Sequence, residues 1–242
     1  MNNEYKINHT VKYSEVDSNY NMRLDHIVSY FQDITGLHSF EMEIDNETML
    51  KLSNAFWVVT KMKLIFHRFP RFQENIVIET WPTTFKGVRF GRDYVIYSKE
   101  NLLISCRSEW CTLDFDSKRP RRVESVHYPH SMPHRLENSN SGEFYNVKEE
   151  INDKDYSHTH KVLLTDIDAN NHTNNIAYIR MALDSFSLEE SKEMNVKEFQ
   201  ISYLNQSFYD DEIKIYKKKK EYGYYLEGLI NNKTIFTLLI II

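Results

Sequence analysis

The chain has 242 residues and a formal net charge of -5 at pH 7, and 41% of its residues are hydrophobic. This length and hydrophobic content suffice for one large domain or two small ones with a real core, which argues against extended disorder. The negative charge argues against a general nucleic-acid-binding protein. Residues 118–122 and 217–220 are local basic clusters, of a kind that most often forms solvated surface.

The two cysteines favour a reducing compartment. Cys106 and Cys111 are five residues apart in a strand-like segment, so their side chains point to opposite faces and cannot pair locally. The first residues show no secretory signal, and the apolar ending at residues 238–242 is too short to cross a bilayer. We therefore expect a cytoplasmic protein without membrane insertion.

The first half of the chain predicts one helix followed by strands. Apolar side chains recur at helical spacing at Leu24, Ile27, Val28, Phe31 and Ile34. Strand-like runs follow at residues 56–69, 76–84, 89–98 and 102–115. We assign residues 1–129 to a first domain. Residues 130–153, rich in Ser, Asn, Glu and Pro without periodicity, are predicted to be a linker.

The second half, residues 154–242, repeats this pattern. Residues 165–170 match residues 14–19 in chemical type, position by position. A helical stripe follows at Ile176, Ile179, Leu183 and Phe186. Strand-like runs then occupy residues 196–204, 212–219, 222–230 and 234–242. Each half thus predicts a strand, a helix and an antiparallel meander.

One helix with four or five strands can bury its apolar face only if the sheet wraps around it. The predicted fold class is therefore α+β, with two tandem hotdog domains, each an antiparallel β-sheet wrapped around a central α-helix.

A polar triplet precedes the second helix. In an extended loop, Asp168, Asn170 and His172 face the same way and can converge on one small volume. Free backbone N–H groups at the start of the helix favour developing negative charge there. The first copy has Asn21 in place of the histidine, so we expect Asp17 and Asn19 only to cap a turn.

The chain resembles the fatty acyl-ACP thioesterases of plants and bacteria, a tandem-hotdog family. Residues 166–179 are similar to the catalytic-helix signature of that family, and residues 57–62 resemble a strand of its first domain. Further similar stretches occur in the family's order at residues 68–70, 80–81, 91–93 and 108–122. The resemblance implies hydrolysis of the thioester that joins a fatty acyl chain to acyl carrier protein (ACP), which ends chain elongation.

The resemblance carries Asp168, Asn170 and His172 over as catalytic positions. Two further family positions, a Glu-Cys pair, fall at Gln206 and Ser207, where this sequence departs from the pattern. Glutamine can orient water or an imidazole but cannot accept a proton, and serine is a poorer nucleophile than cysteine unless a base activates it. An active enzyme, a slower enzyme and an acyl-binding protein without turnover all remain open.

We expect direct attack by water. Asp168, helped by His172, would orient and deprotonate the water, while Asn170 and N–H groups at the start of the second helix would hold the carbonyl oxygen. Attack by Asp168 itself through an acyl anhydride stays an open alternative.

The acyl chain needs an apolar slot, and the carrier protein is acidic. Candidate slot residues in the first half are Met22, Val28, Phe31, Phe56 and Trp57. Candidate carrier-binding residues are Lys118, Arg119, Arg121 and Arg122.

Plant members of the family carry a plastid transit peptide, whereas this chain begins almost directly with its first strand, so we expect a bacterial cytosolic enzyme. The repeat forms an internal pseudo-dimer, and both a monomer and a homodimer are open.

Several other functions compete with this one. Asp166, Asp168 and Asn170 resemble the start of a calcium loop, but Asn171 and Ala177 replace the expected Gly and Glu. Histidine pairs at 158/160 and 127/130 lack a zinc-like pattern, so we expect them on the surface or in the linker, and no metal or cofactor. The runner-up functions are an acyl-CoA thioesterase with the same site and a non-catalytic acyl-thioester-binding protein.

Overall fold

The computed structural model describes residues 3–129, 139 and 141–242. The chain divides into two compact units, Met1–Gly142 and Glu143–Ile242. The boundary falls inside the expected linker at 130–153, of which residues 130–138 and 140 lie outside the described part of the chain.

The end of the expected linker is bound to the second unit. The backbone of Tyr145 exchanges two hydrogen bonds with the side chain of Gln200, at 2.7 and 2.9 Å. The ammonium of Lys220 lies 2.8 Å from the carboxylate of Glu149. Residues 143–152 are therefore packed against the second sheet rather than free of it.

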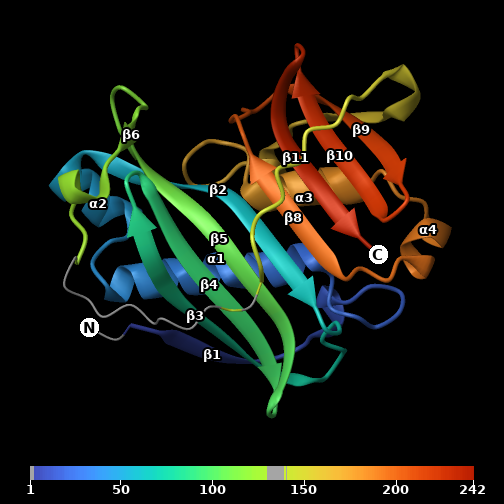
Figure 1. Ribbon diagram of the computed structural model, residues 1–242, viewed down its shortest axis with the longest axis horizontal. Helices are drawn as coiled ribbons and strands as arrows, with labels where there is room; N and C mark the ends of the chain where they lie inside the picture. Colours follow the sequence, from blue (N-terminus) through green and yellow to red (C-terminus); the bar gives the residue numbers. More distant parts are fainter. Residues whose placement is uncertain (1–2, 130–138, 140) are drawn as a thin grey trace. The chain divides into compact units, whose positions relative to one another are not determined.

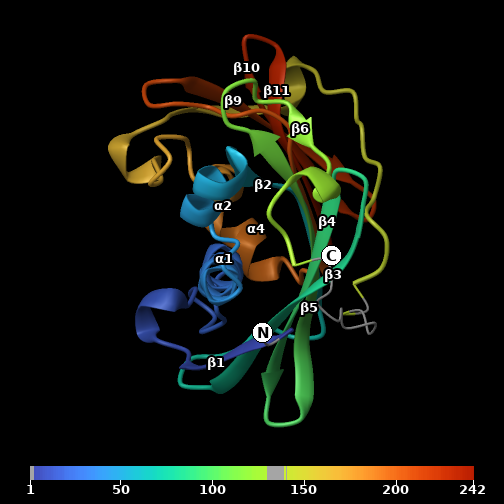
Figure 2. The same ribbon diagram turned by 90° about the vertical axis from the view of Figure 1, so that its left-hand side faces the viewer.

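The first unit is an antiparallel sheet with a long helix on one face (Figures 1 and 2). The sheet order is β1-β3-β4-β5-β2, with β6 paired to β5. Its strands are β1 (Tyr5–Thr10), β2 (Ala55–Phe66), β3 (Asn75–Lys86), β4 (Arg89–Ser98), β5 (Asn101–Asp114) and β6 (Pro120–Arg121). Its helices are α1 (Leu24–Glu41) and α2 (Asn46–Ser53), with short 3-10 turns at Tyr13–Glu15 and Val123–Ser125.

The predicted apolar stripe buries α1 against this sheet. All five stripe residues, from Leu24 to Ile34, are buried. The ring of Phe31 lies 4.7 Å from the ring of Tyr94 on β4, and the hydroxyls of Thr35 and Tyr94 share a hydrogen bond of 2.7 Å. Apolar side chains three and four residues apart thus place one side of the helix on the sheet, as the sequence predicts.

The second unit repeats the arrangement on a smaller scale (Figure 1). Its sheet order is β8-β11-β10-β9-β7, and the ring of Tyr178 on α3 lies 5.3 Å from that of Phe236 on β11. The strands are β7 (Tyr156–Lys161), β8 (Glu198–Tyr203), β9 (Glu212–Lys220), β10 (Gly223–Ile230) and β11 (Lys233–Ile241). The helices are α3 (Asn175–Leu183) and α4 (Leu188–Glu193), with short 3-10 turns at Asp153–Asp155 and Leu164–Asp166.

The expectation of a meander through every strand after the helix is wrong in both units. The strand that follows the helix lies beside the last strand, so β2 pairs with β5 and β8 pairs with β11. Two-residue turns, at Gly87 and at Asn231 with left-handed backbones, force β3-β4 and β10-β11 to be neighbours. The link from β2 to β3 is longer and contains Pro70, so it imposes no such pairing.

Replacing Phe31 by alanine should destabilise the first unit by about 3–5 kcal/mol, because the ring is fully buried and leaves a cavity. Phe40 is on the same helix but 73% exposed, so Phe40→Ala should change stability by no more than about 0.5 kcal/mol. Urea unfolding of the two variants measures the difference. Equal destabilisation would contradict the assigned buried face.

Candidate active site

The polar triplet lies on a closed loop that leads into α3. An isolated β-bridge between Ile167 and Thr173 closes the loop. Asn174 caps the helix, since its side chain accepts a hydrogen bond of 2.9 Å from the N–H of Ile176. The triplet therefore lies just before the first helical turn, where the sequence predicts it.

The carboxylate of Asp168 holds the loop in shape. Its Oδ1 accepts hydrogen bonds from the backbone N–H of Asn170 at 2.8 Å and of His172 at 3.3 Å. Its own N–H donates to the carbonyl of His172 at 2.9 Å, and Asn171 turns the chain with a φ of 61°. The second oxygen, Oδ2, accepts only a long bond of 3.4 Å from Asn170 Nδ2 among the contacts of the described residues.

The rest of the triplet opens towards solvent. Asn170 is exposed, while Asp168 and His172 are half-buried. The imidazole of His172 lies against the exposed ring of Phe208, with 5.3 Å between centroids and an angle of 67° between the ring planes. The structure thus brings the three predicted residues together at the surface of the second unit.

The first unit contains the same loop without the histidine. Asp17 Oδ1 accepts hydrogen bonds from the N–H of Asn19 at 2.8 Å and of Asn21 at 3.0 Å. The N–H of Asp17 donates to the carbonyl of Asn21, and Tyr20 has a φ of 61°. This confirms that Asp17 caps a turn and that Asn21 occupies the position of His172.

The sequence did not predict a pairing of two residues beneath the loop, His160 and Asp166. His160, which was expected on the surface, has its Nε2 atom 2.8 Å from the carboxylate of the buried Asp166. The first unit has the same pairing, between His9 and Glu15, at 2.7 Å. The signal that could have found them is the repeated spacing of six residues from histidine to acid in both halves.

Ser207 is buried and anchors the loop from the other side. Its hydroxyl shares hydrogen bonds with the hydroxyls of Thr173 at 2.7 Å and Tyr178 at 2.9 Å, and its carbonyl accepts from the N–H of Thr173. Burial raises the pKa of Tyr178, so neither partner is a base at neutral pH. Ser207 is therefore arranged as a structural hydroxyl rather than as an activated nucleophile. Its neighbour Gln206 is exposed.

Three of the five candidate acyl-slot residues are core side chains of the first unit. Met22, Val28 and Phe31 are fully buried. Trp57 is half-buried and donates from its indole N–H to the carbonyl of Ile44 at 2.7 Å, and Phe56 is also half-buried. Trp57 packs on an aromatic and aliphatic cluster that is made of Met42, Ile44, Met49, Ala55, Phe90, Val123, Val126 and Tyr128.

The candidate carrier-binding cations fall into two classes. The ammonium of Lys118 lies over the ring of Phe115 at 4.4 Å, and Arg121 bonds Asp114 at 3.2 Å. Arg119 and Arg122 are exposed. Lys118 and Arg121 therefore have structural partners within their own unit, and Arg119 and Arg122 are the better placed to meet an acidic surface.

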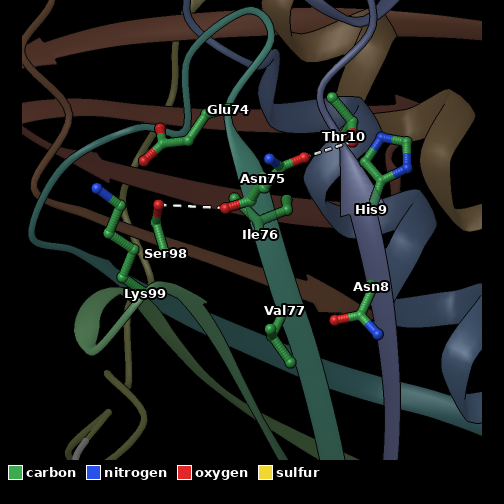
Figure 3. Close-up of a pocket in the computed structure, with 9 residues that line it drawn as sticks. All are labelled: Asn8, His9, Thr10, Glu74, Asn75, Ile76, Val77, Ser98 and Lys99. Carbon is green, nitrogen blue, oxygen red and sulfur yellow. Dashed lines mark hydrogen bonds between the residues drawn. The ribbon is translucent and has the colours of Figure 1, made fainter.

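A separate cleft of about 740 Å³ lies on the first unit, between β1, β3 and the β4-β5 turn (Figure 3). Asn75 bridges it, since its side chain accepts from Thr10 at 2.6 Å and its carbonyl from Ser98 at 3.2 Å. The residues that line the cleft include none of the triplet residues.

Neither a metal-type cluster of side chains nor a helix able to span a membrane occurs in the described part of the chain. No three His, Cys, Asp or Glu side chains gather there as a metal site would require. None of the helices placed by the structure has the length and apolar character needed to cross a membrane.

Family models match both halves of the chain. The acyl-ACP thioesterase N-terminal domain matches residues 2–128, and the acyl-ACP thioesterase C-terminal domain matches residues 149–236. The chain belongs to the acyl-ACP thioesterase family. The loop with Asp168, Asn170 and His172 lies in the part that matches the C-terminal domain.

Relatives of this thioesterase-family chain include plant enzymes. It is 22% identical over 223 residues to a chloroplastic oleoyl-ACP thioesterase of Coriandrum sativum, covering 86% of this chain and 60% of the relative. It is 20% identical over 213 residues to a chloroplastic acyl-ACP hydrolase of Cuphea viscosissima, covering 81% of this chain and 50% of the relative. The chain thus spans only part of the length of these relatives.

Solved structures share the fold over almost the whole chain. An acyl-ACP thioesterase from Bacteroides thetaiotaomicron has a TM-score of 0.83 at 18% identity, and the 12:0-ACP thioesterase from Umbellularia californica has a TM-score of 0.86 at 13% identity. Each match covers 99% of this chain and 97% of the other. This likeness confirms the predicted α+β fold with two tandem hotdog units.

Replacing Ser207 by alanine should destabilise the second unit by about 1–3 kcal/mol, because two buried hydroxyls lose a partner. Thermal unfolding measures this loss. Turnover of an acyl thioester at a temperature where the variant is folded should stay within about tenfold of the wild type, whereas loss of a serine nucleophile costs about 10⁶-fold in a serine protease. A loss of about 10⁶-fold would contradict this structural role and indicate that Ser207 is a nucleophile.

Proposed function

We propose that this chain hydrolyses fatty acyl-ACP to a free fatty acid and ACP. The observation that carries the proposal is the loop of Asp168, Asn170 and His172 in front of α3, in the half that matches the C-terminal domain of the family. Water adds its oxygen to the thioester carbonyl, the carbon–sulfur bond breaks, and the thiol of the carrier leaves with a proton.

Asp168 is the base in this proposal. Its Oδ1 is occupied by two backbone N–H groups, which fix the carboxylate, while the contacts of Oδ2 with the described residues are limited to the long one from Asn170. Oδ2 is therefore the oxygen that can accept a proton from water. The same contacts also support the alternative in which Asp168 itself attacks the thioester carbonyl and forms an acyl anhydride. The two routes differ in the first step of the reaction.

His172 and Asn170 complete the site. The imidazole of His172 is held at the loop end by Phe208 and can protonate the leaving thiolate. The expected oxyanion donors at the helix start are fewer than the sequence suggests, because Asn174 already takes the N–H groups of Ile176 and Ala177. The exposed side-chain amide of Asn170 therefore becomes the main donor to the carbonyl oxygen.

The carrier and the compartment are part of the proposal. The exposed guanidinium groups of Arg119 and Arg122 supply charge complementary to an acidic carrier. Cys106 and Cys111 are free thiols, which fits a reducing compartment, and we assign the protein to the cytoplasm.

Asp168→Asn should lower the rate of thiol release from acyl-ACP by about 10²–10⁴-fold, because the amide keeps the loop shape but cannot accept a proton. Asp17→Asn is the matched control in the first unit. It makes the same exchange of a carboxylate for an amide at the equivalent capping position and should leave the rate unchanged. Thiol release from a panel of acyl-ACPs measures both variants.

The same panel separates the competing functions. Turnover that prefers acyl-CoA over every acyl-ACP would indicate an acyl-CoA thioesterase. Tight binding of acyl-ACP without any thiol release would indicate a non-catalytic acyl-thioester-binding protein. Equal loss of activity in the Asp17 and Asp168 variants would contradict the assignment of the second loop.

A further inference from the structure

Asp166 joins the two ends of the loop that carries the triplet, with its buried carboxylate bound to β7 and its backbone carbonyl bound to the residue that caps α3. Asp166 Oδ2 accepts hydrogen bonds from His160 Nε2 at 2.8 Å and from the N–H of Leu163 at 3.0 Å. Its other oxygen lies 3.6 Å from the guanidinium of Arg180 on α3. The carbonyl of Asp166 accepts from the N–H of Asn174 at 2.7 Å, and Asn174 caps α3.

These contacts join Asp166 to β7 on one side and to the start of α3 on the other. His160 is on β7, Asp166 ends the 3-10 turn before the loop, and Asn174 follows the loop. Asp168 and His172 both lie between Asp166 and Asn174. Loss of the carboxylate contacts therefore allows the base of the loop to shift, although among the described residues no hydrogen bond or ion pair joins Asp166 to a triplet side chain.

We call the contacts of the Asp166 carboxylate with His160 and Leu163 a clamp. The first unit contains an equivalent clamp beneath its loop, which has no histidine. Glu15 Oε2 accepts from His9 Nε2 at 2.7 Å and from the N–H of Lys12 at 2.9 Å. Its Oε1 accepts from the hydroxyl of Tyr30 at 2.7 Å, and its carbonyl accepts from the N–H of Arg23 at 2.8 Å. Burial alone would raise the pKa of Glu15, but these hydrogen bonds hold it below its usual range.

A comparison of the two clamps distinguishes a role in folding from a role in catalysis. Both hold a loop of the same shape, with a carboxylate that receives a histidine N–H and a backbone N–H. Only the second lies beneath a loop with the complete triplet. Breaking either clamp should loosen its own unit, but only the second should change the chemistry.

We propose that Asp166 and His160 are positioning residues for the hydrolysis, which rests on the function proposed above. They fix the ends of the loop so that Asp168 and His172 keep their relative placement. A displacement of about 1 Å from the productive geometry can cost about 100-fold in rate, so a residue that touches no substrate can have a large effect.

The test compares Asp166→Ala and His160→Ala with Glu15→Ala and His9→Ala. We expect the two second-unit variants to lower kcat for acyl-ACP hydrolysis by about 10–100-fold with KM nearly unchanged. The first-unit variants should leave both constants unchanged. Thermal unfolding verifies that each variant is folded at the assay temperature.

A conservative variant distinguishes positioning from folding. Asp166→Glu should recover most of kcat, because the first unit forms the same contacts with a glutamate. His160→Ala keeps the test open if Asp166→Ala fails to fold, since it removes one bond and leaves the backbone bond of Leu163 to Asp166 in place.

The outcomes are separable from failure of the proposed function. A wild-type protein without thiol release would overturn both proposals. An active wild type whose kcat is unchanged by loss of either Asp166 or His160, or is lowered equally by loss of Glu15, would overturn only the positioning role.

Discussion

One carboxylate oxygen that accepts two backbone N–H groups determines the shape of the candidate site. In Asp168 this contact closes a turn of five residues and aligns Asn170 and His172 before α3. Because Oδ1 has this structural task, the chemistry has to use Oδ2. The same oxygen pattern in Asp17 shows that the turn forms without a catalytic histidine.

The duplication therefore separates what the fold requires from what the proposed catalysis requires. A capped turn, a buried acid–histidine pair and a helix start occur in both units. The additional feature of the second unit is the imidazole of His172, which replaces the amide of Asn21. We expect Ser207 to add little to this chemistry, because its hydroxyl is fixed by Thr173 and Tyr178, whereas the exposed Gln206 stays a candidate for orienting water.

Local patterns in the sequence predicted much of this structure, and long-range contacts could not be predicted. The stripe from Leu24 to Ile34 placed α1, and alternation placed the strands within a few residues of their observed ends. The helix α4 was missed although Ser187 and Glu190 form a capping box that the sequence displays. The pairing of β2 with β5 was missed because no local signal specifies a partner so distant in the chain.

The candidate site also contains features that the sequence could predict and features that it could not. The triplet of Asp168, Asn170 and His172 was predictable because its geometry depends on neighbouring residues. The burial of Ser207 was not, since its partners Thr173 and Tyr178 are about 30 positions away and meet it only in the folded unit. The acyl-slot residues could not be separated from core residues, because an apolar side chain serves both purposes equally.

The most direct test of the account is His172→Asn, which makes the second loop match the first in its Asp, Asn and Asn positions. The account predicts that thiol release from acyl-ACP falls by at least about 100-fold while the thermal unfolding midpoint stays near that of the wild type. Wild-type turnover in this variant would contradict the claim that the imidazole makes the second loop the catalytic one.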